Sequence, residues 1–170
     1  MDNQSFISEF KSQCIRQMEL NLPRIEKCFK ILTEEDIWMQ PNSSSNSIGH
    51  LILHLCGNIR QYAISSLGDI PDIRLREEEF SARGGYTKND LFVKLTETVS
   101  EAVNVIRVVS DDDLLRHRIV QGFNYTGIGI MIHVTEHFSY HTGQIAFWAK
   151  LMKDKDLGFY AGVDLNKKNL

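Results

Sequence analysis

The sequence predicts an all-α protein folded as an up-down four-helix bundle, with short extra helical or coil segments. Apolar residues recur at spacings of three and four over four separate segments, the pattern of helices that bury one face. No two neighbouring segments show the alternating pattern of paired strands, so helices alone are expected to build the core. The 170 residues are most economically one domain, residues 1–170, which is long enough to bury a substantial core.

The first predicted helix covers residues 6–32, whose apolar side chains form a single stripe. Pro23 is expected to kink it, because proline lacks a backbone donor and crowds the preceding turn. A loop rich in serine and asparagine follows, and Ser47 or Asn46 is expected to cap a second helix. This second helix is predicted from about residue 48 to residue 66.

Breaks at residues 68–72 and at Gly84-Gly85 enclose a charged segment, residues 74–80, that is expected to be a loop. Thr87 with Asp90 three residues later resembles a capping box. It predicts the start of a third helix, in which the apolar period continues to residue 106.

The remaining chain contains one more long helix. Residues 111–113 are compatible with a short helical turn, and residues 116–120 are ambiguous and compatible with an extended segment. The fourth helix is predicted to begin between residues 125 and 127 and to end near residue 153. The tail, residues 154–170, is expected to pack as coil.

Composition limits the classes of function. A net charge of −3 gives no electrostatic drive toward nucleic acid, and 42% apolar with 24% charged residues is typical of a soluble globule. The three cysteines form no C-x-x-C pattern and are expected to be buried thiols. No apolar run approaches a membrane span, and the N-terminus lacks the features of a signal peptide. A cytoplasmic protein without nucleic-acid or membrane partners is expected.

Three histidine pairs have the i,i+4 spacing of neighbours on a helix face: His50/His54, His133/His137 and His137/His141. Such side chains have Cβ atoms roughly 5–6 Å apart, so two imidazoles can bind one ion. This pattern predicts a metal site. In a bundle, His137 and His141 need a partner from another helix, and His54, which lies in an apolar segment, is the best candidate. His50 is expected to be exposed or behind a ligand, and His133 to be a core or rim residue.

Four other side chains are candidates for supporting the site. Asn58 and Gln144 follow candidate ligands by about one helical turn, where they can hydrogen-bond an imidazole or remain plain surface residues. Arg74 and Arg76 can place a guanidinium near the metal to hold a substrate carboxylate, since the planar fork suits that contact. Their alternative role is in a solvated charged loop with internal ion pairs.

Two segments, Asn46-Ser47-Ile48-Gly49-His50-Leu51-Ile52-Leu53-His54-Leu55 and His137-Phe138-Ser139-Tyr140-His141-Thr142-Gly143-Gln144-Ile145, carry a family resemblance. Together they resemble the DinB-like (YfiT-like) superfamily of metal-binding four-helix bundles, which is distinct from the DNA polymerase of similar name. The resemblance implies a metal triad of His54, His137 and His141, a divalent ion such as zinc or nickel, and a homodimer. It also implies, from some relatives, thiol-dependent transferase or isomerase activity with a low-molecular-weight thiol.

The leading hypothesis is therefore a metal-dependent enzyme of the thiol S-transferase type that acts on a small molecule. Three neutral imidazoles leave an ion with an open coordination position, as in catalytic zinc sites. Two alternatives stay open: a metal-dependent hydrolase, and a non-enzymatic stress protein that binds the metal or a small ligand. No further general acid or base is evident in the sequence, so no catalytic side chain is assigned.

Overall fold

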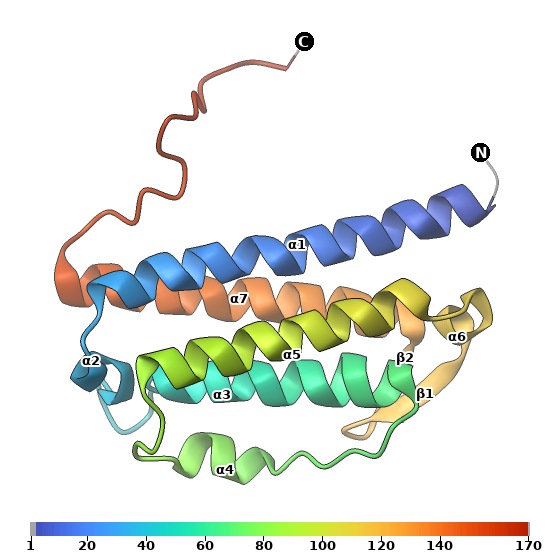
Figure 1. Cartoon of the computed structure of the whole chain (residues 1–170), viewed down its shortest axis with the longest axis horizontal. Helices are drawn as coiled ribbons and strands as arrows, with labels where there is room; N and C mark the ends of the chain where they lie inside the picture. The colour runs from blue at the N-terminus through green and yellow to red at the C-terminus, as the bar shows by residue number, and fades with distance from the viewer. Residues whose placement is uncertain (1–2, 170) are drawn as a thin grey trace.

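Four long helical segments form a bundle in the computed structural model, which describes residues 3–169, with side chains from residue 5 onward (Figure 1). They are α1 (Asn3–Ile31), α3 (Ile48–Ile59) continued by the π-helix η1 (Arg60–Leu67), α5 (Lys88–Val108) and α7 (Gly127–Lys153). Helix α1 packs against α5 and α7, and α3 packs against the same two helices. The predicted all-α bundle is confirmed.

Helices α3 and α5 run in the same direction, which corrects the predicted up-down order, because the connection between them returns along the outside of the bundle (Figure 1). This crossover, residues 68–87, contains the short helix α4 (Arg76–Ser81), which packs against α3. The sequence predicted only a charged loop here. Acidic residues occupy the first turn of α4, where they favour the positive end of the helix dipole. The crossover therefore covers one side of α3.

The core lies between the four long helices. Their apolar period turns one face of each helix inward, so that the side chains interlock with little exposed surface. The buried side chains include Met18 and Ile25 of α1, Ile52 and Leu55 of α3, Leu91 and Leu95 of α5, and Ile130, Val134 and Phe138 of α7. Within residues 3–169, no helix has the length and apolarity that crossing a bilayer requires.

Two predicted helix starts are confirmed by their caps. The Ser47 hydroxyl oxygen accepts from the backbone N–H of His50 at 3.1 Å, and the Ser47 N–H donates to Nδ1 of His50 at 3.2 Å. Thr87 and Asp90 form the expected capping box at the start of α5. Helix α1 continues through Pro23 as one uninterrupted helix.

A small β-hairpin corrects the expectation that the chain has no paired strands. Strand β1 (His117–Val120) pairs antiparallel with β2 (Phe123–Thr126), and Gln121 and Gly122 form the turn with positive φ angles of 51° and 83°. Both angles are those of a type I′ turn, usually marked by Asn-Gly. Four-residue strands and a Gln-Gly turn give little sequence signal. Two short helices, α2 (Glu34–Trp38) and α6 (Asp111–Leu115), complete the fold.

Candidate metal centre

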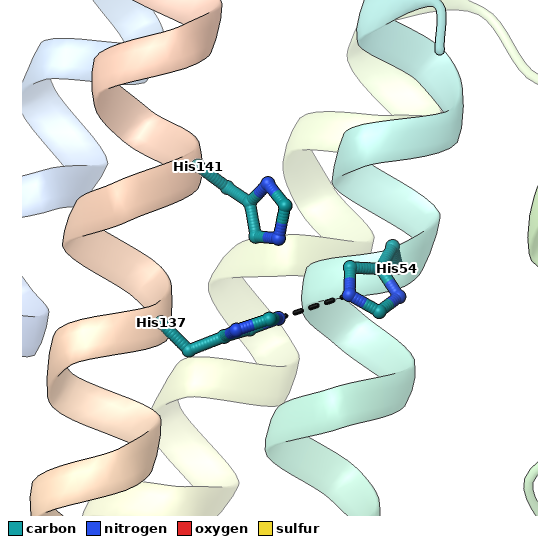
Figure 2. A group of neighbouring side chains, drawn as sticks. All are labelled: His54, His137 and His141. Carbon is teal, nitrogen blue, oxygen red and sulfur yellow. Dashed lines mark hydrogen bonds between the residues drawn. The ribbon is translucent and has the colours of Figure 1, made fainter. Parts of the chain in front are cut away.

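Three histidines meet across the seam between α3 and α7: His54 from α3, and His137 and His141 from successive turns of α7 (Figure 2). One ring nitrogen from each lies within 4.8 Å of the other two. The Nε2 atoms of His54 and His137 are 2.9 Å apart. The ring of His141 lies with its centroid 5.0 Å from that of His54 and 4.4 Å from that of His137. The three imidazoles therefore face one small volume.

The environment keeps two of these imidazoles neutral. Burial, together with repulsion by His141 and His54, lowers the pKa of His137 to about 3. Burial also lowers the pKa of His141 to about 4, even though a hydrogen bond to Gln144 raises it. Both rings are thus uncharged at neutral pH and keep a lone pair on one nitrogen. That is the form in which histidine binds metal ions.

A buried ion pair contacts His54 at Nδ1 of its ring. Glu79 Oε2 lies 3.0 Å from Nδ1 of His54, and Arg74 donates to both carboxylate oxygens of Glu79, at 2.6 and 2.8 Å. The side chains of Arg74 and Glu79 are only 2% and 8% exposed. Burial raises the pKa of Glu79, but hydrogen bonds from Arg74 and His54 hold it below its usual value, so the carboxylate is ionised and can only accept.

The ionised carboxylate decides which ring nitrogen of His54 carries the proton. Nδ1 also lies 3.1 Å from Nη2 of Arg74, but that nitrogen already donates to Glu79. The charge-assisted bond from Nδ1–H of His54 to Glu79 is the stronger choice. It leaves the lone pair on Nε2, the atom that faces His137. Carboxylates that support metal-binding histidines have this same arrangement.

Gly57 makes this approach possible. A Cβ atom built on Gly57 would lie 1.9 Å from Oε1 of Glu79 and 2.9 Å from Nε of Arg74. Only glycine lets the ion pair lie this close to the backbone of α3. The same crossover places the Phe80 ring 5.0 Å from that of His54.

Gln144 supports His141 in a comparable way. Its Oε1 lies 2.6 Å from Nδ1 of His141, so Nδ1–H donates to the amide oxygen and Nε2 keeps its lone pair. The amide nitrogen of Gln144 in turn donates to the hydroxyl of Tyr140 at 3.2 Å. Thus two of the three histidines are anchored through Nδ1, which leaves the lone pair of each on Nε2.

The other candidate residues from the sequence differ in which side chains they contact. Arg74 reaches His54 and Glu79, whereas Arg76 is exposed, with its guanidinium 4.8 Å from the centroid of the Phe80 ring. Asn58 is 3% exposed, and its Nδ2 lies 3.2 Å from Nε2 of His133.

His50 is buried, with 1% of its surface exposed, which corrects the expectation that it is exposed or lies behind a ligand. Its Nδ1 accepts from Ser47, and its Nε2–H donates to the carbonyl of Ala82 at 2.7 Å. These bonds tie the start of α3 to the end of α4 and occupy both ring nitrogens. His50 therefore has a structural role.

The donor set fits a tetrahedral divalent ion. At zinc–nitrogen distances of about 2.0–2.1 Å, two ligand nitrogens are roughly 3.3 Å apart. The observed separations of 2.9 Å and of no more than 4.8 Å reach this value with small side-chain rotations. One buried polar atom nearby, Oδ1 of Asn58, has no hydrogen-bond partner among the described residues.

Comparisons with known proteins agree with this fold. A family model described as "Protein of unknown function (DUF1572)" matches residues 5–161. The crystal structure of a DinB-like protein, YjoA from Bacillus subtilis, aligns with a TM-score of 0.65 and 18% sequence identity, covering 87% of this chain and 96% of that one. At this identity the likeness shows the fold, which is DinB-like as the resemblance predicted. The search of curated proteins gave no match.

Proposed function

We propose that this chain, which belongs to the DUF1572 family of proteins of unknown function, binds one divalent metal ion through His54, His137 and His141. The observation that carries the proposal is the convergence of three ring nitrogens, two of them on histidines whose Nδ1 atoms are already bonded to Glu79 and Gln144. Three imidazole ligands are the set of catalytic rather than structural zinc, and zinc or nickel suits such ligands.

Each side chain has a distinct role in this proposal. Glu79 and Gln144 fix the tautomers of His54 and His141 and aim their Nε2 lone pairs at the ion. Arg74 keeps Glu79 ionised and in place, and is not free to hold a substrate. When bound, the ion acts as a Lewis acid that lowers the pKa of a water molecule or thiol beside it.

We further propose that the nucleophile is a low-molecular-weight thiol supplied from outside, as in an S-transferase. The protein has no suitable thiol of its own, because burial raises the pKa of Cys28 and Cys56 to about 11 and also raises that of Cys14. Among residues 5–169, one carboxylate, that of Glu79, hydrogen-bonds the triad, and it is already paired with Arg74 and His54. Without a free base, a thiol near pKa 8.5 is activated more easily than water at 15.7.

The first test is metal content per chain, measured by mass spectrometry on purified wild-type protein after incubation with zinc or nickel. About one ion per chain is expected in the wild type, with loss in His137→Ala. His117→Ala is the matched control, because His117 is exposed on β1 and bonds to Asn124. A wild-type protein without metal, or a His137→Ala protein that keeps its ion as tightly, would refute the site.

A second test separates the possible activities. The metal-loaded protein is assayed with an activated aryl halide as electrophile, with and without a thiol such as cysteine. Turnover that requires both metal and thiol is expected for the S-transferase. Hydrolysis of activated esters without thiol would favour a hydrolase, and tight metal binding without either activity would favour the non-enzymatic protein.

A further inference from the structure

His137 differs from the other two triad histidines in how it is held. Nδ1 of His54 contacts Glu79 and Nδ1 of His141 contacts Gln144, but among the described residues none forms a hydrogen bond with Nδ1 of His137. Its hydrogen-bond contact is through Nε2, the atom that must bind the ion. Once Nε2 binds an ion, ring contacts are what the described residues offer to fix the plane of this ring.

His133, one turn earlier on α7, supplies a flat surface at that position. Its ring is stacked on that of His137, with centroids 5.2 Å apart and planes inclined by 21°. It is also stacked on Tyr62, with centroids 4.2 Å apart and planes inclined by 29°. The imidazole of His133 thus packs against both Tyr62 of η1 and the ring of His137.

His133 is itself kept in place and kept out of the ligand set. Its Nε2 is directed to the amide nitrogen of Asn58, 3.2 Å away, and the group of possible ligands does not include it. Burial lowers its pKa, so it stays neutral and adds no charge beside an ion. Asn58 is itself buried, with 3% of its surface exposed, so the surrounding packing holds its amide beside His133.

The π-helix explains how Tyr62 reaches this stack. Helix α3 changes to η1 at Arg60, and the wider turn of a π-helix shifts the side chains that follow it. Tyr62 is 2% exposed, and its hydroxyl donates to Gln121 of the hairpin turn at 3.0 Å. The ring is therefore fixed at both ends. π-Helical segments are rare and frequently lie at functional sites.

We propose that His133 is a positioning residue of the metal centre: clamped by Tyr62 and Asn58, it orients the ring of His137 for metal binding by stacking. The proposal rests on the metal site proposed above. Hydrogen bonds at Nδ1 orient the rings of His54 and His141. In this proposal, the ring of His133, supported by Tyr62 of the π-helix, orients the ring of His137 instead.

Three substitutions of His133 separate stacking from hydrogen bonding. His133→Phe keeps a flat ring and loses the bond to Asn58, His133→Gln keeps a polar partner for Asn58 and loses the ring, and His133→Leu loses both. The dissociation constant for zinc is measured by competition with a chelator, and the visible spectrum of the cobalt-substituted protein reports ligand geometry. Supporting groups of metal-binding histidines typically contribute about 10–100-fold to affinity.

If stacking orients His137, the His133→Phe protein binds zinc within about threefold of wild type, whereas His133→Gln and His133→Leu bind at least about tenfold more weakly with altered cobalt spectra. Wild-type affinity in His133→Gln or His133→Leu would overturn the proposal. So would complete loss of metal in His133→Phe, which would make His133 a ligand. Thermal melting of each metal-free variant shows whether it folds, and His133→Phe is compared with His133→Gln if His133→Leu does not fold. Failure of the wild type to bind zinc would refute the metal site instead.

Discussion

Gly57→Ala should weaken the metal centre although it adds a single methyl group to a residue that touches no ligand. Residue 57 lies on the face of α3 that meets the crossover, where a new Cβ would be 1.9 Å from Oε1 of Glu79. Ordinary contact begins at 3.4 Å, so the carboxylate must move by about 1.5 Å. A shift of that size breaks hydrogen bonds of 2.6 Å to Arg74 and 3.0 Å to His54.

The magnitude follows from two opposing contributions. Alanine in place of glycine inside a helix stabilises by about 0.8–1 kcal/mol. Breaking a buried ion pair destabilises by about 3–5 kcal/mol, and both partners here are at most 8% exposed. The net expectation is a loss of about 2–4 kcal/mol in the free energy of unfolding. The affinity for zinc should fall by about 10–100-fold, because His54 loses its carboxylate partner.

Urea denaturation of the metal-free protein and chelator competition for zinc measure these two effects. Gly143→Ala is the matched control, since Gly143 is exposed on α7 and nothing lies within 4 Å of the added Cβ. It should leave zinc affinity unchanged and stabilise by up to about 1 kcal/mol. In a Glu79→Ala background, Gly57→Ala should lose most of its destabilising effect. A Gly57→Ala protein as stable as wild type, with the same zinc affinity, would refute the reasoning.

Two other predictions concern groups away from the triad. Because burial raises the pKa of Cys28 and Cys56 to about 11, both thiols should react with an aromatic disulfide reagent at pH 8 only after the protein unfolds, and rapid reaction of the native protein would contradict their burial. Burial raises the pKa of Asp36, but its bonds, chiefly from Lys153 at 2.6 Å, bring it below the ordinary 3.8. Its folded pKa is thus depressed, so its stabilising effect is present above pH 3.8 and lost as pH falls through the folded value. Wild type should exceed Asp36→Asn in stability at pH 7 and lose that advantage as the pH falls below 3.8, and a difference independent of pH would exclude the ionised pair as its source.

The helical parts of the fold could be read from the sequence because their signals are local. The apolar period and the Ser47 and Thr87 caps marked the starts of α3 and α5 correctly. The direction of α5 could not be read in this way. It depends on whether residues 68–87 make a tight turn or cross back along the bundle, and that is decided by the packing of α4 on α3.

In the candidate site, too, some residues have a local sequence signal and others are placed only by tertiary packing. His137 and His141 are neighbours by helix geometry alone, so their spacing brought them together in advance. Glu79 gave no such signal, because it is the last of three consecutive glutamates in a short charged segment. Only the structure distinguishes it, since Glu77 and Glu78 are exposed while Glu79 is buried against Arg74. His50 shows the opposite problem, a sequence signal without a matching role. Its spacing to His54 is that of a ligand pair, but its ring caps the start of α3.

The three proposed ligands are held on their Nδ1 sides by contacts of decreasing strength, and this order has a consequence. Nδ1 of His54 has a charge-assisted bond to a buried carboxylate, Nδ1 of His141 bonds to a neutral amide, and the ring of His137 is stacked on that of His133. His137 is also the most exposed of the three, and its Nε2 contacts Nε2 of His54. We therefore expect His54 and His141 to be in place before metal arrives, and His137 to make the adjustment that completes the site.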